Sequence, residues 1–116
     1  MRAVIQQVSK ASVTIEESVK SSIEEGLLNL SIRDVKGSAM VISQFTLFAS
    51  TKKGNRPSYI RAARPDVAVP LYEQFVSQLS RDIGKDVKTG EFGAFMKVTL
   101  VNNGPVTIFI DTKNKE

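Results

Sequence analysis

One segment with a helical repeat, set between segments that alternate like strands, is the feature that most constrains the fold of this chain. Its apolar residues recur at three- and four-residue intervals: Tyr72, Phe75, Val76, Leu79 and Ile83. This spacing predicts one amphipathic helix that ends near Gly84, because glycine favours helix C-termini. Asp66 is a candidate N-cap, whereas Pro70 favours a later start of the regular helix.

Six other segments are predicted strands, because they alternate apolar with polar residues or are rich in β-branched residues. They are Arg2 to Val8, Ala11 to Glu16, Val19 to Ile23, Ser38 to Ala49, Phe95 to Val101 and Val106 to Ile110. The first two would form a hairpin around Ser9 and Lys10. The expected fold class is α+β, with a mainly antiparallel, barrel-like sheet and at least one packed helix.

The size and composition of the chain limit its possible chemistry. Its 116 residues and 12.7 kDa predict a single domain over residues 1–116. Since it has no membrane-length apolar run and no apolar signal centre, we expect a cytoplasmic protein without membrane contact. The absence of Cys and His excludes Ser-His-Asp and Cys-His triads and most zinc sites, so we expect neither metal nor cofactor. The net charge of +4 is compatible with a polyanionic partner.

The segment Ser43-Gln44-Phe45-Thr46-Leu47 places three hydrogen-bonding side chains in a predicted strand that is otherwise made of large apolar residues. Buried polar groups need partners. The ordinary interpretation is that each of these side chains bonds to neighbouring backbone. Three of them together favour the wall of a pocket.

The segment Asn102-Asn103-Gly104-Pro105-Val106-Thr107 has the composition of a hairpin turn, which is its ordinary interpretation. Gly104 and Pro105 also suit a second role. Glycine lets a backbone approach a ligand closely, and an X-Pro bond can be cis at low cost. A rigid backbone edge of this kind could act as a steric gauge.

Five cations lie close together with no acid before Asp66: Lys52, Lys53, Arg56, Arg61 and Arg64. A solvated surface loop is the ordinary interpretation, and phosphate binding beside the polar segment is the functional one. Tyr59 is the only aromatic residue among these cations. That disfavours a generic platform for stacking single-stranded bases.

A glycine-punctuated segment, Thr89 to Met96, leads into the next predicted strand and carries Phe92, Phe95 and Met96. Most such residues belong to a core. One of them could instead stack on a base or flank an adenosine.

Four motifs follow one another along the chain: Ser-Gln-Phe-Thr-Leu at Ser43, Arg-Pro-Ser at Arg56, Thr-Gly-x-Phe-x-Ala-x-Met at Thr89, and Asn-x-Gly-Pro-Val-Thr at Asn102. In this order they resemble the D-aminoacyl-tRNA deacylases. The N-terminal Val-Ile-Gln at Val4 also fits the family pattern. Each motif alone is weak, but together they span nearly the whole chain.

The resemblance implies a homodimeric enzyme that hydrolyses the ester bond of D-aminoacyl-tRNA. Gly104 and Pro105 would form a cis peptide that enters the partner's active site, where their carbonyls hold the substrate's α-ammonium and block an L side chain. Because a steric wall cannot reject glycine, we also expect activity on glycyl-tRNA.

The expected site has three further parts. The pocket would consist of Ser43, Gln44, Phe45 and Thr46, the terminal adenosine would lie near Phe92 and Met96, and tRNA would contact Lys52, Lys53 and Arg56. Thr46 is the only obvious side-chain nucleophile, and no base for it is visible. Catalysis is therefore expected from positioning and backbone donors, with help from the terminal ribose 2′-hydroxyl.

Two features depart from the family pattern. Gln7 stands where members usually have Arg, which removes a cation expected to brace the Gly-Pro turn. Leu28 and Asn29 are joined directly where members usually carry the rest of a strand, a helix and a further strand. We interpret this joint as an omission of residues, because the loss of core elements would be costly in so small a domain.

Two other interpretations stay open. One is a non-catalytic RNA- or tRNA-binding module whose whole function is the basic loop Lys52 to Arg64. Salt-dependent RNA affinity without deacylation would favour it. The other is a structural dimer built on strand pairing, which would be favoured if charge reversal in that loop changed nothing.

Overall fold

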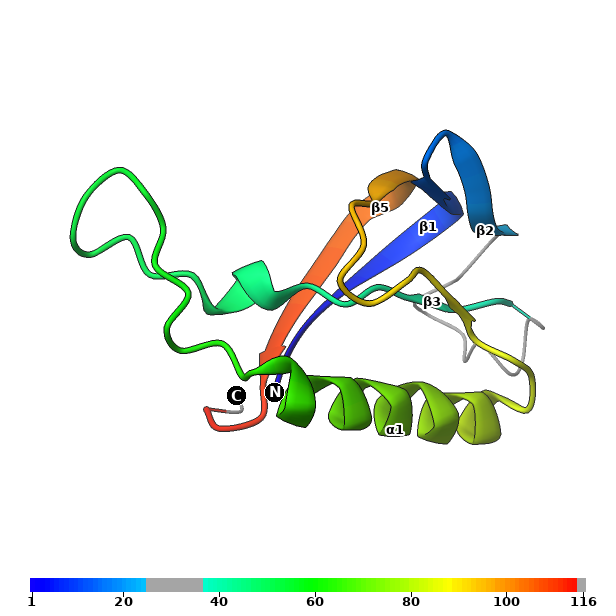
Figure 1. Ribbon diagram of the computed structural model, residues 1–116. Coiled ribbons are helices and arrows are strands. Elements are labelled where there is room, and N and C mark those ends of the chain that lie inside the picture. The colour runs from blue at the N-terminus through cyan, green and yellow to red at the C-terminus, as the bar shows by residue number, and fades with distance from the viewer. Residues whose placement is uncertain (25–36, 115–116) are drawn as a thin grey trace.

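The computed structural model describes residues 1–24 and 37–114, and the predicted omission between Leu28 and Asn29 lies outside these ranges. Figure 1 shows one long helix, α1 (Pro65–Ile83), beside two long strands, β1 (Arg2–Ile15) and β5 (Lys97–Asp111). β1 is the middle strand of a three-stranded sheet with the order β2-β1-β5. The α+β class expected from the sequence is confirmed. No helix in the described ranges is long and apolar enough to cross a bilayer.

β1 is one strand where the alternation predicted two. It pairs antiparallel with β2 (Ser18–Glu24) on one side and with β5 on the other. The hairpin predicted around Ser9 is wrong, because register shifts on both sides of Val8 interrupt the alternation without reversing the chain. The chain reverses instead at Glu16 and Glu17, whose φ angles of 50° and 66° suit a tight hairpin turn.

The long strand predicted from Ser38 to Ala49 is wrong over most of its length. Only β3 (Met40–Val41) is a strand, and it pairs in parallel with β4 (Lys88–Thr89). The 3-10 helix η1 (Phe45–Phe48) follows it. A single helical turn points neighbouring side chains in several directions.

α1 ends where the sequence predicts and begins earlier. Gly84 closes it in the left-handed conformation with φ of 76°. The helix starts at Pro65 with Arg64 as its N-cap, so Asp66 is not the cap. Proline suits the first helical position because its φ is already helical. Pro70 lies inside the helix and removes one backbone hydrogen bond without ending it.

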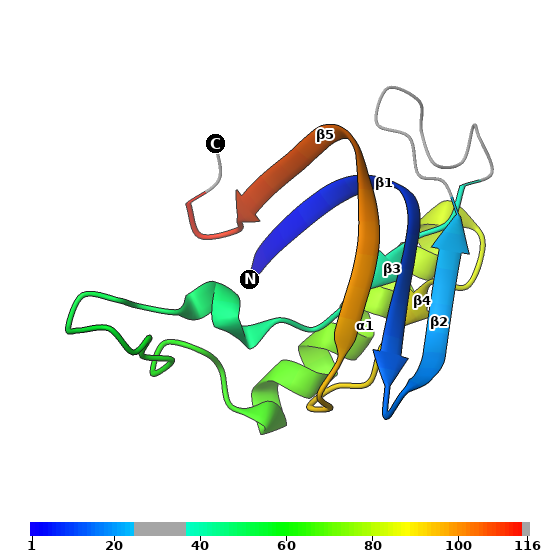
Figure 2. The same cartoon turned by 90° about the horizontal axis from the view of Figure 1, so that it is seen from above.

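Tyr72 anchors α1 to the short strands. Its hydroxyl donates to the Val41 carbonyl at 3.1 Å, and its ring lies 5.7 Å from that of Phe92. Burial raises the pKa of the Tyr72 hydroxyl above its ordinary value. Figure 2 shows α1 behind β3 and β4, on the side from which Tyr72 reaches Val41.

The buried core is small. Four apolar side chains of the described residues are buried: Val8, Val13, Ile23 and Val87. Val13 in β1 has no exposed surface at all. Val13 lies in the middle strand, where it pairs with Ser21 of β2 and Val98 of β5.

Apolar surface remains uncovered on the outer half of β1 and β5. Four large side chains there are 40% to 57% exposed: Val4, Ile5, Ile108 and Phe109. Exposed apolar patches of this kind mark interaction surfaces more often than free solvent-facing sheet. The register places Val4 and Phe109 on one face of this strand pair and Ile5 and Ile108 on the other. Each face therefore carries apolar side chains that another body could bury.

Val13→Ala should lower the free energy of unfolding by about 1–3 kcal/mol, because it removes two methyl groups from a site without solvent and leaves a cavity. Urea unfolding followed by circular dichroism measures this loss. Val19→Ala on β2 is the matched control, since Val19 is 64% exposed. Equal effects of the two substitutions would contradict the assignment of Val13 to the core.

Candidate functional site

The central feature of the site is a wide bulge in β5. Gln6 of β1 pairs with Thr107 of β5, and Val8 pairs with Asn102. One residue of β1 therefore lies opposite the four residues 103–106 of β5, which must leave the ladder. The hairpin interpretation of this segment is wrong, because the chain on both sides of the bulge pairs with the same strand.

The side chain of Asn102 braces the bulge. Its Oδ1 accepts a hydrogen bond from the Val106 N–H at 2.9 Å, and its Nδ2 donates to Thr107 Oγ1 at 2.9 Å. Gln6 Nε2 donates to the same oxygen at 3.3 Å. Gln7 supplies none of these bonds, so the described chain braces its turn with amides rather than with the cation it lacks.

Gly104 and Pro105 form the exposed tip of the bulge, and the peptide bond between them is cis, as the sequence motif led us to expect. Gly104 has φ of 139°, a conformation that L side chains rarely adopt. A Cβ at this position would lie 2.8 Å from Val106 Cγ2 and 3.0 Å from Val106 N. The backbone of the tip is thus available for contact only because this residue is glycine.

The polar motif forms a compact turn rather than a strand edge. Gln44 Nε2 donates to Thr46 Oγ1, while the Leu47 N–H donates to the Gln44 carbonyl at 3.3 Å. Gln44 and Phe45 are exposed, and Ser43 and Thr46 are half-buried. The four predicted pocket residues therefore lie together at the start of η1. We call this segment, Ser43 to Thr46, the pocket turn.

No catalytic base accompanies Thr46. Its hydroxyl accepts a bond from an amide, and the sequence holds no His or Cys. Over the part of the chain that the structure covers, no group of three or more acidic, His or Cys residues is placed to hold a metal ion. The arrangement is suited to positioning and to main-chain hydrogen bonding rather than to attack by a side chain.

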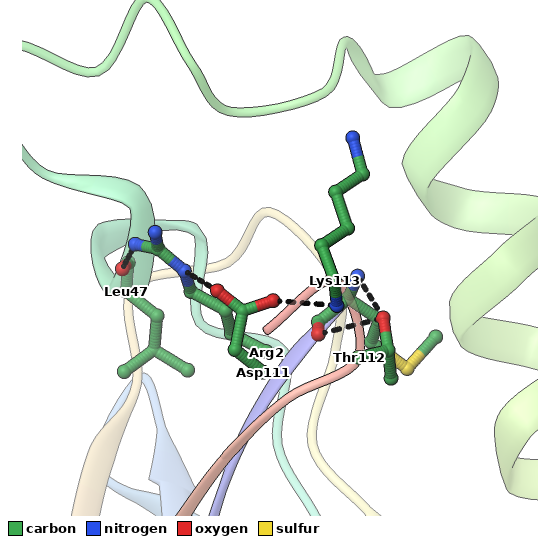
Figure 3. A network of polar contacts seen from close by, with 6 residues as sticks. Arg2, Leu47, Asp111, Thr112 and Lys113 are labelled. Carbon is green, nitrogen blue, oxygen red and sulfur yellow. Dashed lines mark hydrogen bonds and ion pairs between the residues drawn. The ribbon is translucent and has the colours of Figure 1, made fainter. Parts of the chain in front are cut away.

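Arg2 joins η1 to the end of the sheet where β1 begins and β5 ends, as Figure 3 shows. Its Nε lies 3.0 Å from Asp111 Oδ2, and its Nη1 donates to the Leu47 carbonyl at 2.7 Å. The guanidinium also lies 4.6 Å from the centre of the Phe48 ring. The turn that carries the pocket residues is therefore fixed to β1 and β5 by one side chain.

Asp111 is the anionic partner in this network. Its other oxygen, Oδ1, accepts the Lys113 N–H at 2.9 Å. This backbone bond and the bond from Arg2 hold the pKa of the Asp111 carboxyl below its ordinary value. The carboxylate form is thus favoured in the folded chain.

Phe92 and Met96 lie where the chain passes from β4 to β5, and both are half-buried. Phe92 lines an open hollow of about 430 Å³ together with Tyr72, Val76 and Thr89. Gly90 touches Met96 so closely that a Cβ there would collide with the Met96 sulfur. The two predicted adenosine residues are therefore close to each other in the chain, but Met96 packs inward on Gly90 while Phe92 faces the hollow.

The basic loop extends away from the body of the molecule (Figure 1). Ser50 and Ser58 close it by two backbone hydrogen bonds, of 2.8 Å and 2.7 Å. Lys52, Lys53 and Arg56 lie exposed between them, as the sequence predicts. Their ammonium and guanidinium groups are free to meet anions in solution.

The turn at Ser43 to Thr46 and the bulge share no polar or ring contact among the described residues. No hydrogen bond, ion pair or ring contact in the described residues joins Ser43 to Thr46 with Gly104 or Pro105. Sequence reasoning missed two contributors, Arg2 and the bracing role of Asn102. The partners of Arg2 lie far from it in the chain, so only the tertiary structure shows that role. Asn102 bonds within its own segment, but its bracing role depends on the bulge that the pairing of β5 with β1 creates.

Asp111→Asn should make stability less sensitive to acid. A lowered folded pKa means that the carboxylate stabilises the fold above its ordinary pKa of 3.8, and that this stabilisation is lost as the pH falls through the folded value. Melting temperatures of both proteins between about pH 7 and pH 2 measure the effect. The wild-type melting temperature should fall more steeply on the acid side, and identical slopes would contradict the role of Asp111.

Asn102→Ala should loosen the bulge and speed hydrogen exchange at the Val106 amide by about 5- to 10-fold, the value of one modest hydrogen bond. Asn102→Asp is the matched control, because it keeps an acceptor for that amide and removes only the donor to Thr107. Exchange measured by NMR should stay slow in Asn102→Asp. Unchanged protection in Asn102→Ala would show that the side chain does not brace the turn.

Comparison with known proteins identifies the family. The sequence profile of the D-Tyr-tRNA(Tyr) deacylase family matches residues 24–111. Proteins named D-aminoacyl-tRNA deacylase are 52% identical in Bacteroides fragilis, 48% in Flavobacterium psychrophilum and 53% in Phocaeicola vulgatus, with all of both chains covered each time. These alignments span 150 positions, so at least 34 positions have no residue among the 116 of this chain.

A solved structure has the same fold. The chain superposes on the c-Myc DNA Unwinding Element Binding Protein with a TM-score of 0.84 and 28% sequence identity, covering 97% of this chain and 99% of that one. The match of the family profile to most of the chain agrees with the relatives of about half identity. The chain therefore belongs to the D-Tyr-tRNA(Tyr) deacylase family of ester hydrolases.

Proposed function

We propose that this chain hydrolyses the ester bond of D-aminoacyl-tRNA. Water adds to the ester carbonyl, the bond to the ribose oxygen breaks, and a proton passes to that oxygen, releasing free D-amino acid and tRNA. The names of the relatives support the substrate class. The observation that carries the proposal is the braced bulge of β5, which presents the backbone of Gly104 and Pro105 in the open.

The bulge serves as the chiral gauge of a second subunit. Within its own chain it has no polar or ring contact with the pocket turn, so its exposed tip is free to enter another molecule. Apolar side chains on the outer half of β1 and β5 flank the bulge, with Val4 and Phe109 on one face and Ile5 and Ile108 on the other, and one of these faces would be buried in a homodimer. The Gly104 and Pro105 carbonyls would hold the α-ammonium and leave no space for an L side chain.

The pocket itself lies at η1. The first N–H groups of a helix have no partner within it, so those at the start of η1 can polarise an ester carbonyl or stabilise its oxyanion. Ser43, Gln44 and Thr46 position the substrate, and the terminal ribose 2′-hydroxyl assists the departing oxygen. No cofactor or metal enters this scheme.

The tRNA is held on either side of the ester. Phe92 lines the hollow beside Tyr72 and contacts the terminal adenosine, with Met96 behind it. Lys52, Lys53 and Arg56 contact phosphates, since they lie exposed on the projecting loop. We place the enzyme in the cytoplasm, where aminoacyl-tRNA is used. Family membership favours this scheme over a non-catalytic RNA-binding module.

The test is deacylation of one tRNA charged in turn with the D form of an amino acid, its L form and glycine. We expect hydrolysis of the D-aminoacyl and glycyl esters and little hydrolysis of the L ester, because the gauge excludes a side chain and not a hydrogen. Equal rates on D and L esters would overturn the gauge. Hydrolysis of the D ester without the glycyl ester would overturn only the extension to glycine.

Gly104→Ala and Pro105→Ala should each lower the rate on the D ester by about 100-fold, because they displace the contacting carbonyls. Val19→Ala is the control with unchanged activity. Mixing Gly104→Ala with a Thr46→Val variant should restore part of the activity, since one site of each mixed dimer then has a wild-type turn and a wild-type bulge. No restoration would show that both groups act within one chain.

A further inference from the structure

An exposed aromatic pair lies beside the pocket turn. The rings of Phe45 and Tyr59 have centres 4.9 Å apart and planes inclined by 70°, so the edge of one meets the face of the other. Phe45 is 60% exposed and Tyr59 is 37% exposed. The next residue, Ile60, is 90% exposed. Three large apolar side chains therefore face solvent, and one of them, Phe45, lies between Gln44 and Thr46 in the chain.

The loop backbone holds this surface in place. Ser58, directly before Tyr59, exchanges two hydrogen bonds with Ser50. The Tyr59 carbonyl accepts the Ala62 N–H at 2.9 Å, which closes a turn that contains Ile60. The aromatic pair is thus positioned by backbone on both sides rather than by a buried core. Such ordering lowers the entropy lost when a flat ligand binds.

The charge around the pair favours a polyanion. Lys52, Lys53 and Arg56 precede Tyr59, and Arg61 and Arg64 follow it, with no acid between them. The one ion pair described in this stretch is a loose one, 3.9 Å between Arg64 and Asp66 with both side chains exposed. A neutral protein partner would use the apolar surface without needing this dense positive rim. Stacked bases with phosphates on their outer side match both features.

We propose that Phe45, Tyr59 and Ile60 form a stacking surface for the unpaired bases of tRNA that precede its terminal adenosine. The inference rests on the proposed function, because the pocket turn sets the position of the ester that the terminal adenosine carries. The terminal adenosine carries the ester, so the bases before it would lie beside the turn that holds the ester, where Phe45 stands between Gln44 and Thr46 and its ring meets that of Tyr59. An edge-to-face pair leaves ring surface open, and base stacking on aromatic side chains tolerates any base.

The experiment compares one D-amino acid esterified to full-length tRNA with the same amino acid esterified to adenosine, which has no preceding bases. Tyr59→Ala should raise KM for the tRNA ester about 5- to 100-fold, leave kcat unchanged, and leave hydrolysis of the adenosine ester unchanged. Tyr59→Phe should retain the wild-type KM because it keeps the ring. Ile60→Ser, at the most exposed position, should raise KM by a smaller factor without risk to folding, and Val19→Ala is the control for surface substitution.

Two results would overturn the stacking surface: an equal loss on both esters in Tyr59→Ala, or no change in KM for the tRNA ester. If the wild-type protein hydrolyses neither ester, the proposed function fails, and binding of a fluorescent single-stranded RNA ending in CCA decides the present inference by itself. Weaker binding by Tyr59→Ala than by Tyr59→Phe would support it. Equal binding by the two variants would overturn it and point to a protein partner for the patch.

Discussion

The unequal pairing of β1 and β5 is the constraint on which the site depends. Antiparallel pairing on both sides of the bulge fixes where residues 103–106 leave the sheet, so the extra residues have no alternative path. Asn102 then replaces the lost ladder bonds with side-chain bonds to Val106 and Thr107. A short loop at a strand end would lack these two fixed ends, and its tip would be free to change shape.

Arg2 extends the same constraint to the other half of the site. It lies where β1 and β5 meet near the chain ends, and it reaches the Leu47 carbonyl at the end of η1. The strand pair that creates the bulge therefore also holds the turn with the polar motif. The strand pair β1–β5 holds both the bulge and the turn. In our proposal the turn belongs to the active site of its own subunit and the bulge to that of the partner subunit.

The chemistry fits a chain without His or Cys. A side-chain nucleophile would need a base to activate it, whereas main-chain hydrogen-bond donors act through their position alone. Gly104 shows how closely that geometry is specified, since even a methyl group at this position would contact Val106. Among the described residues the buried core is small, and apolar side chains on the outer half of β1 and β5 stay exposed.

The sequence predicted the α+β class and the C-terminal end of the helix at Gly84. These follow from local rules, because helical periodicity and glycine at a helix end depend on near neighbours in the chain. It misplaced what depends on distant partners: one strand with shifted register was interpreted as a hairpin, and η1 as a strand. Only the tertiary structure put Phe45 beside Tyr59 and Arg2 beside Leu47. Such contacts depend on how distant segments pair and pack, and the alternation of residues along one segment does not identify its partner.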